Sequence, residues 1–263
     1  MSRKLSQDEV RGFWTEQSQK HGQSHAASWS DRMAIELEIR EVLKHLQDGD
    51  RVLDVGCANG YSTVEFARQR QIQVRGLDYI PEMITQARAR LDGLSTRGSV
   101  EFAVGDITSL DEPDDHYDRV VAIRVLINLG SWERQLRALR ECARVAKPGG
   151  TVLLSEATLQ GWRRLNAFRR EWGLPDIPMP AFNEYLDEDQ MRAAGVPKLR
   201  LETVVDFSSS YFVGTRVLKP LLIQALGGAI DVADPEMEWN RWFAQLPPLG
   251  DYGTQRLFVF HKS

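Results

Sequence analysis

The chain has 263 residues and a formal net charge of −4, with a pI near 5.8, which argues against a general nucleic-acid binder. Its 42% apolar and 27% charged residues are typical of a soluble globular protein, and the length favours one large α/β domain over two. Because no run of about 18 apolar residues and no apolar leader occurs, the sequence predicts neither a membrane span nor a secretory signal. Cys57 and Cys142 give no disulfide framework, so we expect a reduced, cytoplasmic protein.

The first 46 residues are predicted to be helical. Leu5–Gln19 favours one helix, and a polar loop follows it. Asp31–Leu46 favours a second helix, because its apolar residues recur at helical spacing. We expect residues 1–46 to form a helical lid, in which Trp14 and Trp29 either cover a ligand or simply pack in the core.

Residues 52–60, Val-Leu-Asp-Val-Gly-Cys-Ala-Asn-Gly, predict a short buried strand that runs into a turn of small residues. The amphipathic run Tyr61–Arg70 follows as a helix. Such a turn lets the backbone approach a nucleoside-containing ligand closely, because larger side chains would collide with it. By itself this pattern does not identify the ligand, because similar turns bind several different cofactors.

Four more strands are predicted downstream, and several end in polar residues. They are Gln73–Asp78, the run from Val100 to Gly-Asp-Ile at 105–107, Tyr117–Arg124, and the strand that follows Lys-Pro-Gly-Gly at 147–150 and ends at Glu156. Helical runs at Pro81–Leu91 and Trp132–Val145 separate them. Alternation of this length predicts a parallel sheet covered on both faces, with ligands beyond the carboxyl ends of the strands.

Together these motifs resemble the class I S-adenosylmethionine-dependent methyltransferases, over about residues 50–156. The resemblance implies a Rossmann-like three-layer α/β sandwich with a mostly parallel seven-stranded sheet and an antiparallel last strand. It also implies S-adenosyl-L-methionine as cofactor. Ala58 stands where the family usually has glycine, and we expect the turn to survive if this position has a negative φ.

The resemblance assigns the cofactor contacts residue by residue. Asp54, Gly56, Ala58 and Gly60 match the first motif, and Asp78 matches the acid that holds the ribose. The remaining expected contacts are with adenine or lie at the end of the fourth strand: Tyr79, Met83, Asp106, Ile107 and Arg124. The five histidines show no metal-ligand spacing, so no metal is expected.

The segments after the fifth and sixth strands are expected to build the acceptor pocket. We divide the chain into a lid at 1–46 and a methyltransferase domain at 47–263, with insertions near 157–198 and 208–250. Predicted helices are 161–172, 187–194, 211–226 and 234–245, and predicted strands are 199–207 and 254–261. The helix at 211–226 is apolar enough to serve either as lid core or as the contact of a homodimer.

Methyl transfer needs an acceptor lone pair held in line with the S–CH₃ bond, and a general base helps when the acceptor is a hydroxyl. By location, the catalytic candidates are His25, Asn128, Glu156 and Tyr185, with Tyr211 as a further one. Each has a structural alternative: a solvated histidine, a helix cap, an orienting carboxylate or a packed tyrosine.

The expected reaction is methylation, at O or N, of a small polar molecule, such as a sugar of a glycan or of a secondary metabolite. Two alternatives remain from other classes, an RNA methyltransferase and a non-catalytic cofactor-binding protein. A nicotinamide-dependent oxidoreductase is disfavoured, because Tyr61 occupies the place of the third glycine in its turn.

Overall fold

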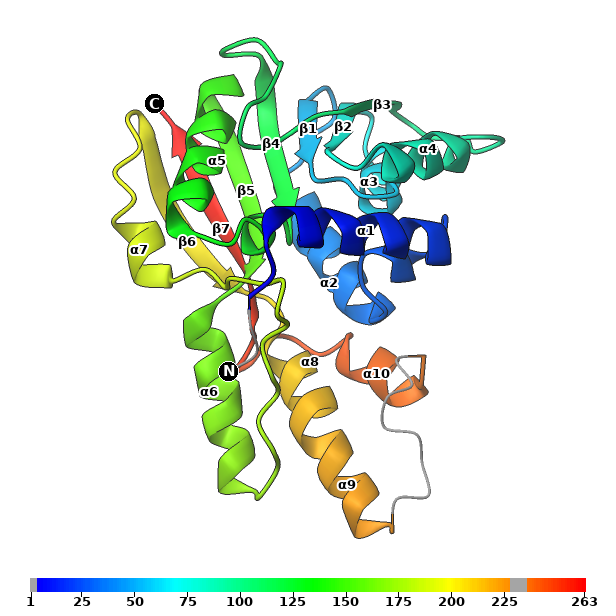
Figure 1. The fold of residues 1–263 in the computed structure, drawn as a ribbon, viewed down its shortest axis with the longest axis vertical. Helices are drawn as coiled ribbons and strands as arrows, with labels where there is room; N and C mark the ends of the chain where they lie inside the picture. Colours follow the sequence, from blue (N-terminus) through cyan, green and yellow to red (C-terminus); the bar gives the residue numbers. More distant parts are fainter. Residues whose placement is uncertain (1–3, 228–235) are drawn as a thin grey trace.

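The computed structural model describes residues 4–227 and 236–263. Seven strands form one sheet in the order β3-β2-β1-β4-β5-β7-β6 (Figure 1). Their bounds are β1 Arg51–Val55, β2 Gln73–Asp78, β3 Ser99–Val104, β4 Tyr117–Ile123, β5 Ala146–Ala157, β6 Leu199–Asp206 and β7 Gln255–Lys262. β1 to β5 pair in parallel, and β7 runs antiparallel to both of its neighbours, β5 and β6. The predicted Rossmann-like fold is confirmed.

Helices flank the sheet, and α6, α8 and α9 extend beyond the end of the sheet that carries the carboxyl ends of the parallel strands (Figure 1). The helices are α1 Gln7–His21, α2 Arg32–Leu43, α3 Tyr61–Gln69, α4 Pro81–Arg90, α5 Trp132–Val145, α6 Leu159–Glu171, α7 Glu188–Arg192, α8 Ser209–Val213, α9 Lys219–Ala225 and α10 Glu238–Phe243. Short 3₁₀ turns lie at His25–Ala27 (η1) and Leu126–Asn128 (η2), and a π-helical turn at Gly214–Leu218. No helix in the described ranges is long and apolar enough to cross a membrane.

Alternation along the strands divides the core between the two faces of the sheet. Val121 of β4 and Leu153 of β5 face α2, whereas the neighbouring Val120 and Val152 belong to the cluster built around α5. All four side chains are completely buried. Because successive side chains of a strand point to opposite faces, one run of apolar residues serves both layers.

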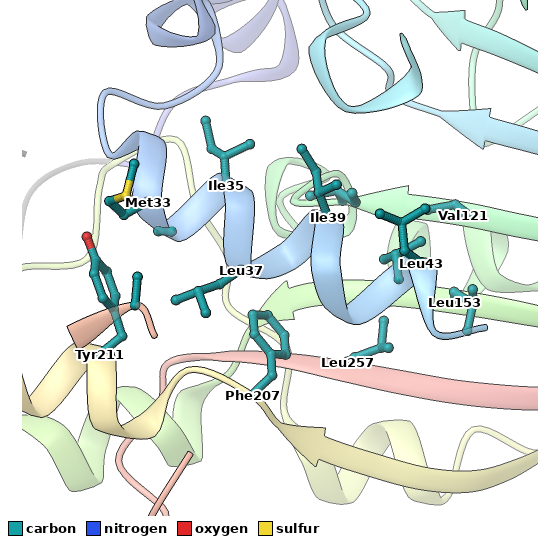
Figure 2. Packing of buried hydrophobic residues seen from close by; sticks show 14 of the residues in the cluster. Met33, Ile35, Leu37, Ile39, Leu43, Val121, Leu153, Phe207, Tyr211 and Leu257 are labelled. Atoms are coloured by element: carbon teal, nitrogen blue, oxygen red, sulfur yellow. The ribbon is translucent and has the colours of Figure 1, made fainter. Parts of the chain in front are cut away.

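Only part of the predicted lid lies over the site. In α2, Ile35, Ile39 and Leu43 belong to the same buried cluster as Val121 and Leu153 of the sheet, and Leu43 lies beside Val121 (Figure 2). This helix is therefore a layer of the core, which differs from the expectation that all of residues 1–46 cover the site. The helix α1 buries few of its side chains and borders the ligand cavity.

The C-terminal insertions also differ in detail from their prediction. The expected helix at 211–226 is divided into α8, the π-helical turn and α9. The hydroxyl of Thr215 donates to the carbonyl oxygen of Tyr211 at 2.6 Å, four residues back, where the ladder widens. Of the helix predicted at 234–245, the first two residues lie outside the described part of the chain, and α10 forms the rest.

Candidate active site

A cavity of about 270 Å³ lies at the carboxyl ends of the parallel strands. Its walls come from the turns after β1, β2, β3 and β4, from α1, and from the connection at 180–185. In a parallel sheet the strand ends gather at one edge, and this explains how residues far apart in sequence meet here.

The turn after β1 approaches the cavity with bare backbone. Gly56 lines the cavity at φ +75°, and a Cβ there would lie 2.3 Å from Cγ2 of Val125. Gly60, at φ +73°, begins α3, and its Cβ would lie 2.5 Å from Cζ of Phe102. Both glycines are thus required by space as well as by conformation.

Ala58 lines the cavity, but its φ is +48°, contrary to the expected negative value. Its backbone N–H donates to Oδ2 of Asp78 at 2.9 Å. This bond, together with the short turn between β1 and α3, holds alanine in a left-handed conformation that L-residues other than glycine seldom adopt.

Asp78 is buried at the end of β2 and lines the same cavity. Its two carboxylate oxygens accept the N–H groups of Ala58 and Ile80, each at 2.9 Å. Burial raises the pKa of this carboxyl to about 6. Each oxygen keeps a further lone pair, so the group can accept bonds from a diol without moving.

The adjoining wall suits a flat heterocycle. Tyr79 and Met83 lie on one side of it, and Ile107 and Asp106 follow β3. Oδ1 of Asp106 accepts both the N–H and the hydroxyl of Thr108 at 2.8 Å, which fixes the orientation of the carboxylate. A carboxylate held beside apolar side chains can accept a bond from a ring amine.

Asp54 and Gly60 were expected to touch the cofactor directly, but neither lines the cavity. Oδ2 of Asp54 accepts the hydroxyl of Thr63 at 2.6 Å, and burial raises the pKa of Asp54 to about 7. The carboxylate thus fastens β1 to the first turn of α3. Both residues shape the turn rather than its ligand-facing surface.

Arg124 lies at the end of β4, at φ +56°, and lines the cavity. Its guanidinium lies 4.8 Å from the ring centroid of Trp29, and its Nη1 is 2.6 Å from Oε2 of Glu38. Glu38 is fully buried, and this burial raises its pKa to about 7. The ion pair joins α2 to the cavity floor and offsets the charge of the arginine.

The four catalytic candidates fall into two groups. Asn128 and Tyr185 line the cavity, whereas Glu156 and His25 do not. Asn128 donates from Nδ2 to the carbonyl oxygen of Arg124 at 2.7 Å, and burial raises the pKa of Tyr185. The tyrosine therefore keeps its proton at neutral pH and is suited to orient an acceptor by hydrogen bonding.

Glu156 is an orienting residue. Its carboxylate, completely buried at the end of β5, accepts the N–H groups of Val125 at 2.9 Å and Leu126 at 2.8 Å. Burial raises its pKa to about 8. Its hydrogen bonds hold the loop after β4, and this loop forms part of the cavity wall, although the side chain of Glu156 is not among the lining residues.

His25 and Tyr211 point elsewhere. The His25 ring lies beside Tyr61, 5.9 Å between centroids, and within 3.4 Å of the carbonyl oxygen of Ser30. Tyr211 is buried and donates to Oδ1 of Asp31 at 2.6 Å. Their positions in η1 and α8 were compatible with a site role by sequence, but the turns of these segments direct both side chains away from the cavity.

Several lining residues were not assigned by sequence. Gln255 begins β7, Asn183 and Phe182 belong to the irregular connection, and Gln7 lies in the first turn of α1. Trp14 and Trp29, the two predicted lid tryptophans, line the cavity as well. No local pattern marks a single carboxamide at a strand start, so Gln255 could be found only in three dimensions.

Among the described residues, no cluster of three or more potential metal ligands occurs.

The lining residues suit a nucleoside ligand: Asp78 can accept bonds from a diol, Tyr79 and Ile107 offer apolar contact, and Gly56 presents bare backbone. The cavity then continues past Arg124 toward Asn128 and Tyr185.

Comparison with known proteins agrees with this arrangement. A family model described as a methyltransferase domain matches residues 52–150. The 27-O-demethylrifamycin SV methyltransferase of Amycolatopsis mediterranei is 27% identical over 247 residues, which cover 91% of this chain and 85% of that protein. The O-methyltransferase resE of Aspergillus sclerotiorum is 28% identical, covering 69% and 71%. Phosphoethanolamine N-methyltransferase 1 of Arabidopsis thaliana is 30% identical, but the match covers only 55% of this chain and 26% of that protein.

Solved structures share the fold over the full length. Magnesium protoporphyrin IX methyltransferase from Synechocystis, solved with bound SAH, superposes with a TM-score of 0.62 at 16% identity, covering 98% of this chain and 100% of that one. The [4+2]-cyclase SpnF superposes with a TM-score of 0.60 at 23% identity, covering 99% and 98%. At these identities the likeness concerns architecture.

Proposed function

Because the chain belongs to the class I S-adenosylmethionine-dependent methyltransferases, we propose that it methylates an oxygen or nitrogen of a small polar acceptor bound between α1 and the ends of β4 and β5. The observation that carries this proposal is one continuous cavity. Its wall includes Asp78 and Asp106 in one part and Asn128 and Tyr185 in another. A donor and an acceptor held there would be neighbours.

The residues of the first part would hold S-adenosylmethionine. Asp78 would accept the ribose hydroxyls, and Tyr79, Met83 and Ile107 would enclose the adenine, with Asp106 at its amine. Gly56 and Ala58 would let the backbone approach the methionine portion. Asp54 and Gly60 would act through the shape of the turn.

When bound, the cofactor would supply an electrophilic methyl group on its positively charged sulfur. The acceptor lone pair would bond to this methyl carbon, and the electrons of the S–CH₃ bond would stay with the sulfur. The aromatic rings of Trp14 and Trp29 would keep water out and favour the positive charge. Asn128 and Tyr185 would orient the acceptor, and its proton would leave to solvent. Positioning of this kind can supply about 7–11 kcal/mol of the barrier reduction.

For the acceptor, we favour a sugar or another hydroxylated part of a secondary metabolite. Its support is the 27-O-demethylrifamycin SV methyltransferase, a relative that aligns over most of both chains. Methylation at a nitrogen atom is the alternative, supported by the similarity to phosphoethanolamine N-methyltransferase 1. That alignment covers only 26% of the relative. The net charge of −4 does not favour RNA as the acceptor.

The proposal is tested by ligand-induced stabilisation. S-adenosylhomocysteine at 100 times its Kd should add about 2.7 kcal/mol to the free energy of unfolding, whereas NADH should add none. Asp78→Ala should remove most of this gain, since the diol partner is lost, while Asp111→Ala, an exposed acid away from the cavity, should retain it. Incubation with S-adenosylmethionine and panels of hydroxylated metabolites, followed by mass spectrometry, should reveal a gain of about 14 Da. The absence of any stabilisation by S-adenosylhomocysteine would contradict the proposal.

A further inference from the structure

Three carboxamide side chains line the cavity with a buried carbonyl oxygen that has no hydrogen-bond partner among the described residues. They are Oδ1 of Asn128, Oδ1 of Asn183 and Oε1 of Gln255. Gln255 is only 5% exposed. Buried polar atoms in folded proteins nearly always have partners, and unpaired ones call for an explanation.

All three lie on the same side of the cavity. In the sheet order, β3, β2 and β1 carry the candidate cofactor residues, and β4, β5 and β7 follow on the other side. Asn128 lies in η2, directly after β4, and Gln255 pairs with Ala157 where β5 ends. Asn183 is held nearby, because the N–H of Glu184 donates to the carbonyl oxygen of Ile127 at 2.6 Å.

No group among the described residues donates to these three oxygens, although the side chain of Asn183 also interacts with that of Tyr185. The amide nitrogen of Asn128 is already bonded to the carbonyl oxygen of Arg124, so its oxygen is the free end. A carbonyl oxygen can only accept, and it therefore needs an O–H or N–H group from the ligand. Three such oxygens on one wall can all be satisfied only by a ligand that has several O–H or N–H donors.

Two cations line this side. Arg124 is paired with the carboxylate of Glu38 at 2.6 Å, whereas Arg134, in the first turn of α5, has a buried Nε without a hydrogen-bond partner among the described residues. No aspartate, glutamate or histidine is among the described residues that line the cavity beyond Arg124. Flat side chains, Trp29, Phe182 and Tyr185, complete the wall. These flat side chains suit a ring that packs against them.

We propose that the methyl acceptor is a ring compound with at least two O–H or N–H donors besides the group that is methylated. Asn128, Asn183 and Gln255 select it by accepting those hydrogen bonds. This inference rests on the proposed methyltransferase function and specifies the substrate class of the same site.

The first test concerns the protein without an acceptor. If Gln255 serves a ligand, Gln255→Met, which has nearly the same shape, should leave the melting temperature unchanged or raise it. Gln135→Met is the matched control, because the Gln135 amide donates to the carbonyl oxygens of Leu126 and Glu184 at 3.2 and 2.8 Å. That variant should melt at a lower temperature. A comparable loss of stability in Gln255→Met would assign Gln255 a structural role and overturn its part in selection.

The second test uses two rings that differ in their donors: 1,3,5-trihydroxybenzene and 1,3,5-trimethoxybenzene. Dissociation constants are measured by calorimetry on the full chain saturated with S-adenosylhomocysteine. We expect the trihydroxy ring to bind wild type at least tenfold more tightly than the trimethoxy ring. In Gln255→Met or Asn183→Ala this preference should fall threefold or more, while the affinity for S-adenosylhomocysteine changes less than twofold. Gln245→Met, an exposed glutamine outside the cavity, should keep the full preference.

The outcomes separate the two proposals. If S-adenosylhomocysteine does not bind, the proposed function itself fails. If it binds, but the two rings bind equally, neither binds, or the preference survives in both variants, only the inferred acceptor class is overturned. A preference for the trimethoxy ring would also overturn it, because that ring has no O–H to donate.

Discussion

At the scale of single residues, Ala58 bears a conformational cost within the turn that lines the cavity. Its φ of +48° lies in the left-handed region, which costs an L-residue about 1–2 kcal/mol. Ala58→Gly removes this cost but adds about 0.4–1 kcal/mol of chain entropy to the unfolded state. We therefore expect a net gain of about 0.5–1 kcal/mol in the free energy of unfolding, measured with urea.

The control for this substitution is Ala87→Gly within α4, where Ala87 is completely buried in a regular helix. There glycine should lower the free energy of unfolding by about 1 kcal/mol or more. A loss of stability in Ala58→Gly as well would show that the left-handed conformation of Ala58 is not costly.

Residue types at the strand ends were predictable to different degrees. Asp78 and Asp106 could be found from the sequence, because each follows a strand whose end must reach the ligand edge. Glu156 also follows a strand, yet its carboxylate accepts N–H groups from residues 125–127 and does not line the cavity. Position along a strand sets the edge at which a side chain lies, but neighbouring loops decide which way it points.

At the scale of elements, α1 is fastened to the turn after β1 by one side chain. Nδ2 of Asn59 donates to the carbonyl oxygens of Gly22 at 2.8 Å and Ser24 at 2.7 Å, just beyond the end of α1. Asn59 is completely buried. Asn59 thus links the turn that lines the cavity to the C-terminal end of α1.

Asn59→Ala should therefore loosen α1. With two bonds lost at about 1 kcal/mol each, we expect affinity for S-adenosylhomocysteine to fall by up to about thirtyfold. Amide hydrogen exchange in α1 should become faster, while exchange in β1 and β4 stays slow.

Asn166→Ala provides the comparison for this prediction, because Asn166 fastens Ile177 through its amide and carbonyl groups rather than α1. In Asn166→Ala, amide hydrogen exchange should become faster around Ile177 and stay unchanged in α1. Unchanged exchange in α1 of Asn59→Ala would refute the link.

At the scale of the whole molecule, several carboxyl groups are buried under the sheet's carboxyl edge. Burial raises the pKa of Glu38 and Asp54 to about 7 and that of Glu156 to about 8. In the unfolded chain these groups release their protons near pH 4.5 or below. Between pH 6.5 and 8.5 the folded state thus holds more protons than the unfolded state, and its stability must fall as the pH rises.

We expect urea unfolding of the ligand-free protein to show this decline from pH 6.5 to 8.5. Glu156→Gln, which cannot ionise and keeps an oxygen for the N–H groups of Val125 and Leu126, should show a smaller decline. The exposed Glu133→Gln should retain the wild-type slope. An identical slope in Glu156→Gln would mean that Glu156 is ionised throughout this range.

The sequence by itself determined the order of strands and helices, the glycine turn after β1 and the acids after β2 and β3. These are local properties, since the period of apolar residues and the absence of a Cβ act within a few residues. Only the tertiary structure decided that α2 joins the core, that Glu156 supports the loop after β4, and that Gln255 reaches the cavity from β7. These outcomes depend on contacts between segments more than 25 residues apart in the chain, such as Glu156 with Leu126, 30 residues away, and no local pattern encodes such contacts.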